Sequence, residues 1–193
     1  IPVPGPSDAQ RTLSLYLSWL WYAARRRGFA LDGDDTDPVS EPGRLAEALE
    51  AFAPILHLRD EDREAVLAQA RLERYGVGEV ILGAGIVPDE VCFVVSGRAH
   101  LSLETHGGRV EFGAAERGDI IGHTALTREP TQAVTTAAEI LTVLVLPLTT
   151  VDGLIRSSPR LAAEIGESLE LKRRLAAERL STLTAARGFL SGT

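Results

Sequence analysis

The chain has 193 residues, of which 45% are hydrophobic, so it can form one sizeable core but is too short for two domains of ordinary size. Its net charge is −7 and all but one of its 20 basic residues are arginines, which argues against nucleic acid as a partner. Its apolar stretches are shorter than the ~20 residues of a membrane-spanning helix, and its single cysteine, Cys92, excludes an internal disulfide.

A first helix is expected from Ser7 to Arg27, where apolar residues recur at helical spacing and Gly28 provides a stop. Its large apolar side chains, among them Trp19 and Trp21, occupy more than one side, so the helix has to be covered. Two covers are open. One is a preceding domain or a neighbouring subunit, and the other is the main domain, onto which the helix would fold back.

Residues 31–43, LDGDDTDPVSEPG, are acidic, contain two prolines and show no apolar periodicity. This composition is typical of an exposed linker. We therefore divide the chain into a terminal helix of a preceding domain at 1–30, the linker at 31–43 and the main domain at 44–193. The main domain is expected to begin with two helices, one from Arg44 to Phe52 and one from about Glu61 to Gln69, with Asp60 as the cap of the second.

After these helices the apolar period changes to two, in the segments RLERYGVGEVILGAG, EVCFVVSGRAHLSLE, RVEFG and EILTVLVLP. Short strands with glycine corners, and no helix long enough to connect parallel strands, indicate an antiparallel roll or barrel. Ser158 then caps a long helix that begins at Pro159 and runs to about Arg187. The predicted fold is mainly β, a jelly-roll-like antiparallel β-roll with flanking helices and a long C-terminal helix.

Two segments carry a family signature. GEVILGAGIVPDEVCFVVSGRAHLSL has a strand, a turn, a strand and an SGR corner in succession, and ERGDIIGHTAL follows further along the chain. From Arg44 to about Leu175 the chain resembles the cyclic nucleotide-binding domain, and ERGDIIGHTAL resembles the start of its phosphate-binding cassette. The resemblance implies a β-roll that binds cAMP or cGMP through backbone N–H groups at a short helix and through an arginine.

The cassette departs from the family pattern at its polar positions. His123 stands where the family has a glutamate that binds the ribose. The family segment R-S-A-T falls on Thr131 to Val134, so a neutral threonine replaces the arginine and a valine replaces the hydroxyl. A charge-assisted hydrogen bond of this kind contributes about 1.5–3 kcal/mol, or roughly ten- to a hundredfold in affinity. The resemblance therefore implies weak binding of cyclic nucleotide or none.

The candidate ligand-binding residues are Gly122, His123, Thr124, Ala125, Leu126, Arg128, Thr131, Gln132, Ala133 and Val134. The amides of residues 124–126 remain as phosphate donors. Arg128 either swings toward an anion or pairs with Glu129 in solvent, and His123 is either a ligand contact or a core-edge residue. A cavity lined by Ile121, Leu126 and Val134 would instead suit a neutral or amphiphilic small ligand. No catalytic motif and no metal-ligand spacing of His57, His100 and His106 is present, so we expect no enzyme and no metal.

A second resemblance concerns the first helix. LSWLWYAARRRGFAL is similar to the last helix of the cytoplasmic domain of small-conductance mechanosensitive channels, some of which carry a cyclic nucleotide-binding domain after it. The chain opens on IPVPGP, so we interpret it as part of a longer protein. The resemblance implies a cytoplasmic regulatory module of a homo-oligomeric plasma-membrane channel, with the rest of the channel as partner. The alternative is the ligand-sensing half of a transcription regulator without its DNA-binding module. The long C-terminal helix is either a lever or a static cover.

Overall fold

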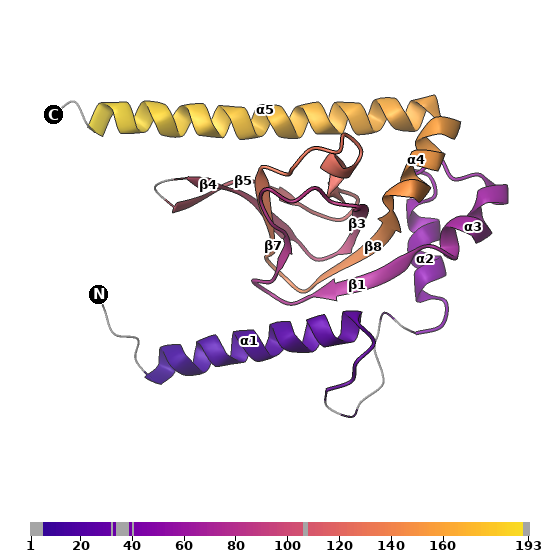
Figure 1. The fold of residues 1–193 in the computed structure, drawn as a ribbon, viewed down its shortest axis with the longest axis horizontal. Coiled ribbons are helices and arrows are strands. Elements are labelled where there is room, and N and C mark those ends of the chain that lie inside the picture. The colour runs from indigo at the N-terminus through magenta and orange to yellow at the C-terminus, as the bar shows by residue number, and fades with distance from the viewer. Residues whose placement is uncertain (1–5, 32, 34–38, 40, 106–107, 191–193) are drawn as a thin grey trace.

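The computed structural model describes residues 6–31, 33, 39, 41–105 and 108–190 (Figure 1). Two four-stranded antiparallel sheets form its centre, one in the order β1-β8-β3-β6 and the other in the order β2-β7-β4-β5. The strands are β1 Arg71–Tyr75, β2 Val80–Leu82, β3 Glu90–Ser96, β4 Ala99–Thr105, β5 Gly108–Ala115, β6 Ile120–Ile121, β7 Ala133–Ala137 and β8 Leu141–Pro147. The predicted antiparallel β-roll is confirmed.

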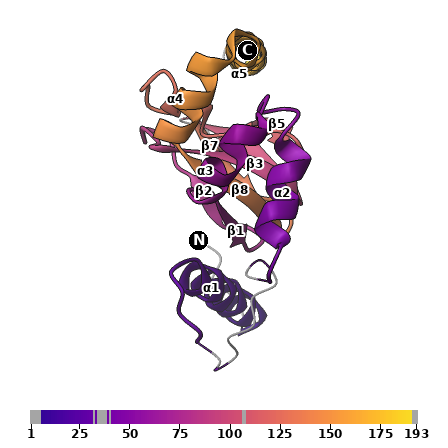
Figure 2. The ribbon, with the colours of Figure 1, turned by 90° about the vertical axis from the view of Figure 1, so that its right-hand side faces the viewer.

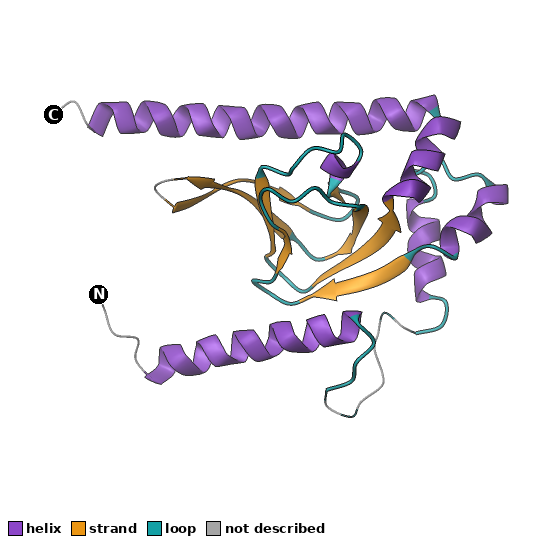
Figure 3. Cartoon of the chain, in the orientation of Figure 1, coloured by secondary structure: helices purple, strands orange, loops and turns teal. Residues whose placement is uncertain are grey.

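Helices surround the roll. They are α1 Pro6–Arg26, α2 Arg44–Phe52, α3 Arg63–Leu67, α4 Leu148–Ser157 and α5 Pro159–Leu190, with short 3-10 helices η1 Asp60–Asp62 and η2 His123–Ala125. The strands lie between the two long helices, α1 and α5, while α2, α3 and α4 gather at one end (Figure 3). A view turned by 90° shows α1 and α5 on opposite sides of the roll (Figure 2).

Strand β8 separates two halves of the core because its side chains alternate between two buried faces. Leu144 and Leu146 belong to a cluster that includes residues of α2, α4 and α5. Val143 and Val145 belong to a second cluster with residues of β4, β5 and β7. A strand with period-two side chains and both faces buried reads as a continuous apolar run. This is why LTVLVL forms the centre of the first sheet.

Two helix predictions differ from the structure, and one helix was not predicted. The helix expected from about Glu61 to Gln69 is instead η1 followed by α3, because Asp60 accepts a hydrogen bond from Arg63 Nε at 2.9 Å and provides no cap. The segment that forms α4 was not predicted as a helix. The long helix α5 does begin at Pro159, with Ser158 Oγ accepting from the Leu161 amide at 3.3 Å, but it continues past Arg187 to Leu190.

The helix α1 folds back onto the roll, which is one of the two covers considered above. Tyr22 is buried against Gly76, where an added Cβ would lie 2.7 Å from its ring, and Trp19 Nε1 donates to the Val77 carbonyl at 2.9 Å. Another face of α1 exposes a helical stripe of apolar residues, Leu13, Tyr16, Leu17 and Leu20. Within the described part of the chain, none of the helices combines the length and hydropathy needed to cross a membrane. Most of the predicted linker at 31–43 lies outside the described residues.

One buried ion pair anchors α1. The guanidinium of Arg26 pairs with the carboxylate of Glu79, with side chains only 17% and 10% exposed. The same guanidinium lies 4.1 Å from the ring centroid of Tyr75, and it donates to the Arg74 carbonyl at 2.6 Å. The Glu79 carboxylate also accepts from the Gly76 amide at 2.9 Å. Arg26 and Glu79 thus each make further polar contacts with the roll besides their own ion pair.

We predict that Arg26→Met lowers the free energy of unfolding by about 3–5 kcal/mol, because the buried Glu79 carboxylate loses its counter-ion. The measurement is urea unfolding, followed by circular dichroism for the roll and by fluorescence for α1, which carries both tryptophans. Arg98→Met is the matched control, since its pair with Glu116 is exposed and should contribute less than about 1 kcal/mol. Equal losses in the two variants would contradict the anchoring role.

Candidate functional site

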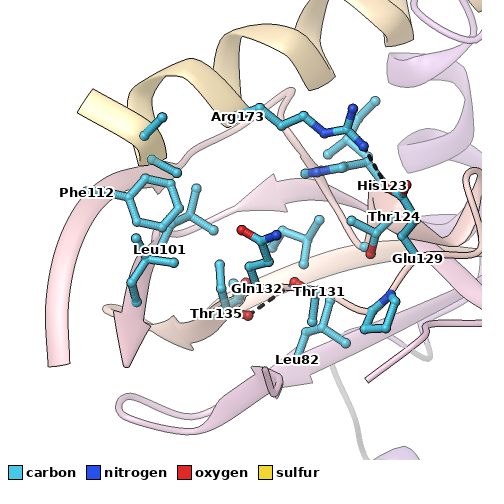
Figure 4. Close-up of a pocket in the computed structure, with 18 residues that line it drawn as sticks. Leu82, Leu101, Phe112, His123, Thr124, Glu129, Thr131, Gln132, Thr135 and Arg173 are labelled. Atoms are coloured by element: carbon cyan, nitrogen blue, oxygen red, sulfur yellow. Dashed lines mark hydrogen bonds and ion pairs between the residues drawn. The ribbon is translucent and has the colours of Figure 1, made fainter. Parts of the chain in front are cut away.

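A cavity of about 540 Å³ lies between the second sheet and α5. Its floor is apolar and includes Leu101 and Leu103, alternate residues of β4. Leu101 faces the cavity together with Phe112 of β5 and Leu82 of β2 (Figure 4). Its rim is polar and comes from η2, from the loop before β7 and from α5. The volume lies in the range of small-molecule sites, and the combination of an apolar wall and a few polar groups is typical of them.

Gly122 forms the backbone turn from which the chain enters the rim of the cavity. Its φ is +80°, a left-handed conformation, and an added Cβ would lie 2.9 Å from the Glu90 carbonyl oxygen, so only glycine fits this turn. From there the chain enters η2, which places His123 and Thr124 in the cavity wall. The hydroxyl of Thr124 is buried and has no hydrogen-bond partner within the described residues. Its hydrogen-bonding capacity is therefore unused within the described residues.

The other polar wall comes from the segment aligned with the family's arginine. Thr131, Gln132 and Ala133 all line the cavity. Thr131 is 8% exposed and its hydroxyl donates to the Ala133 carbonyl at 3.2 Å. Its backbone is also held, since its amide donates to the Ile86 carbonyl at 2.8 Å and its carbonyl accepts from the Gly85 amide at 2.7 Å. The segment therefore supplies a rigid and neutral wall.

Four sequence-predicted site residues do not line the cavity. Ala125 and Leu126 pack into the core with α2 and α4, and their amides donate within the turn, to the Gly122 carbonyl at 3.0 Å and the His123 carbonyl at 3.1 Å. Val134 is buried on β7 and its carbonyl accepts from Ser102 Oγ at 3.3 Å. Arg128 has an exposed side chain whose nearest carboxylate, that of Asp152 on α4, is 4.0 Å away. The other six predicted residues are brought together in the wall.

Two charged residues of the wall were not among the predicted site residues. Arg173 of α5 and Glu129 of the loop after η2 form an ion pair, with Nη2 and Oε2 2.6 Å apart (Figure 4). Glu129 therefore pairs with α5 and not with Arg128. The sequence offers no apolar stripe in this part of α5 that would show which side faces the roll. The position of Arg173 follows only from the packing of the helix.

The histidines outside the cavity have local partners. His57 Nε2 lies 3.1 Å from Glu164 Oε2, and this hydrogen bond is the main cause of the lowered pKa of Glu164. His100 Nδ1 lies 2.7 Å from Glu111 Oε1, and His106 is outside the described residues. Among the residues that are described, no three His, Cys, Asp or Glu side chains gather as metal ligands. Cys92 packs on β3 beside the second core cluster, and burial raises its pKa to about 12, as expected of a core thiol.

Comparison with known proteins identifies the roll. Residues 72–158, which include both sheets and η2, match the model of the family described as the cyclic nucleotide-binding domain. The roll of this chain has the fold of the cyclic nucleotide-binding domain. Domains of this family are regulatory and not catalytic. No curated protein sequence matches the chain.

Solved structures agree with this domain. The catabolite activator protein of Thermus thermophilus is 25% identical with a TM-score of 0.55, and the match covers 68% of this chain and 63% of that one. A mutant of CooA from Carboxydothermus hydrogenoformans is 21% identical (TM-score 0.54; 75% and 90% covered), and PKAR CBD2 bound to Sp-2Cl-cAMPS is 20% identical (TM-score 0.57; 74% and 94% covered). The last two show the shared fold alone. The chain spans less than two thirds of the Thermus protein.

We predict that Gly122→Ala destabilises the cyclic nucleotide-binding domain by about 2–3 kcal/mol, since it adds both a strained φ and a clash with the Glu90 carbonyl. Gly118→Ala is the control: its φ is +96° but an added Cβ meets nothing within 4 Å, so only the backbone cost of about 1 kcal/mol remains. Urea unfolding measures both. A Gly122→Ala variant as stable as Gly118→Ala would show that the cassette backbone can shift away from Glu90.

Proposed function

We propose that this chain is a ligand-sensing regulatory module, in which a small molecule in the cavity sets the position of α5. The observation that carries the proposal is the composition of the wall. Arg173, Ala176 and Ala177 of α5 form one side of the cavity and the sheet forms the other. A ligand that contacts both sides favours the arrangement in which they are close, and this differential contact shifts the equilibrium of the helix.

The proposed ligand class includes cyclic AMP and cyclic GMP, bound weakly. The family fold supports the class, and the solved structure of PKAR CBD2 has Sp-2Cl-cAMPS bound. We expect the binding to be weak because Thr131 stands where the family has an arginine. Its hydroxyl already donates a hydrogen bond to the Ala133 carbonyl. On the cassette side of the cavity, a cyclic phosphate would meet the neutral side chains of Thr124, Thr131 and Gln132.

We predict that Thr131→Arg raises the affinity for cyclic AMP by about ten- to a hundredfold, because it restores a charge-assisted hydrogen bond in the cavity wall. Calorimetric titration of the unmodified chain and the variant at low salt measures the change. Thr149→Arg is the matched control, since it adds the same charge to an exposed position of α4, outside the cavity wall. Equal gains in the two variants would point to a general charge effect, and no binding by Thr131→Arg would refute the proposed ligand class.

For the parent protein, we propose a plasma-membrane channel with this module on its cytoplasmic side, in a homo-oligomer, with α1 as the connection. The similarity of LSWLWYAARRRGFAL to the last helix of mechanosensitive channel domains supports this. The exposed stripe of Leu13, Tyr16, Leu17 and Leu20 also supports it, because such a stripe suits contact with a neighbouring domain. A second candidate, the sensing half of a transcription regulator, is favoured by the 25% identity to the Thermus catabolite activator protein.

The coding sequence on either side of this chain distinguishes the two proposed parent proteins. The channel proposal predicts apolar segments of about 20 residues upstream of Ile1, long enough to span a bilayer. The transcription regulator predicts a helix-turn-helix downstream of Thr193. Reading the gene in both directions is the measurement. A helix-turn-helix without upstream apolar segments would overturn the channel proposal. A gene that encodes neither feature would overturn both proposals.

A further inference from the structure

We propose that Glu129 and Arg173 select an anionic ligand: its negative group displaces the Glu129 carboxylate from Arg173, so that the ligand's charge is bound by α5 and not by the cassette. This inference rests on the proposed function of the cavity as a ligand site, and it assigns the chemistry of that ligand. The class is an amphiphilic monoanion, such as a phosphate diester or a carboxylate on an apolar or aromatic body.

The distribution of charge in the cavity wall is the first support. Among the described residues that line the cavity, Arg173 and Glu129 are the only ones other than His123 that carry or can gain a charge. They come from opposite sides, 44 positions apart, and their side chains point toward one another across the rim (Figure 4). An anion in this cavity therefore finds its one guanidinium on the helix, and finds it occupied by a carboxylate.

The exposure of the pair is the second support. Both side chains are 55% exposed, and exposed ion pairs contribute little to stability because water screens them. The Glu129 carboxylate can return to solvent at small cost when it is released. The guanidinium has a planar fork that suits phosphate and carboxylate groups equally well. A ligand anion can thus replace the Glu129 carboxylate at Arg173 at a small cost in free energy. Glu129 and the ligand compete for the same guanidinium N–H donors.

The remaining wall fixes the orientation of the ligand. The floor opposite Arg173 is formed by Leu101, Leu103 and Phe112, which can cover an apolar or aromatic group. Thr124, Thr131 and Gln132 also line the cavity, and their neutral hydroxyl and amide groups can bind polar atoms of the ligand body. The anionic group is therefore directed toward α5, and the apolar body toward the sheet.

A double-mutant cycle tests the inference, with cyclic AMP as the anionic probe and adenosine as the uncharged probe that shares its base and ribose. We expect Glu129→Gln to raise the affinity for cyclic AMP about three- to tenfold, since it removes the competitor. We expect Arg173→Gln to lower it about tenfold, and the double variant to match Arg173→Gln. Adenosine affinity should stay unchanged, and high salt should reduce the gain in Glu129→Gln.

Controls separate this inference from the proposed function. Arg174→Gln removes the same charge from the neighbouring position of α5, outside the cavity wall, and should leave the affinity for cyclic AMP unchanged. Thr131→Arg shows whether the cavity accepts the probe at all. Binding by Thr131→Arg, together with an affinity in Glu129→Gln no higher than in the unmodified chain, would overturn the inference alone. No binding by any variant at millimolar cyclic AMP would overturn the inference and the ligand class together.

Discussion

The close approach of Gly122 to the Glu90 carbonyl is the constraint on which the cavity depends. It brings the end of β6 against the start of β3 and turns the chain into η2 at a φ that other residues rarely adopt. The next four residues then divide between two environments, with His123 and Thr124 in the cavity wall and Ala125 and Leu126 in the core. The core holds one side of this segment, so the other side is presented to the cavity in a fixed position. The rim is as rigid as the core beneath it.

The same cavity wall is connected to α1 by one short strand. Glu79, which anchors Arg26, directly precedes β2, and Leu82 at the end of β2 lines the cavity. The pairing of β2 with β7 sets Leu82 opposite Thr135, another residue of the wall. Glu79, which anchors α1, and Leu82, which lines the cavity, are therefore three positions apart in the sequence.

The parts of the fold that the sequence predicts are those in which local pattern and burial agree. The alternating strands β3 and β8, the cap at Ser158 and the stop at Gly28 each combine a residue preference with a matching pattern. The helix α4 escapes prediction because Thr149, Thr150 and Gly153 are weak helix formers. Its helical state comes from burying Leu148, Val151 and Leu154 in the core, which is a tertiary effect.

The residues of the cavity also divide into those that the sequence predicts and those that it does not. Gly122, His123 and Thr131 are identifiable because the cassette motif assigns each a position. Glu129 and Arg173 have no such motif, and their meeting depends on the rotation of α5 about its own axis. Local sequence carries little information on that rotation where exposed residues such as Leu171 and Leu175 alternate with charges.

The location of the cavity's guanidinium affects how such a sensor would respond. An arginine in the cassette is held by the rigid roll, so it binds an anion equally well whether α5 is near or far. Arg173 belongs to α5, so it reaches an anion over the sheet only when the helix lies against the rim, as it does in the pair with Glu129. Binding and helix position then share one interaction, and a ligand's affinity for Arg173 enters directly into the equilibrium between the helix positions. The loss of the cassette arginine would in this way weaken the binding of the anion while coupling what remains more closely to the movement of α5.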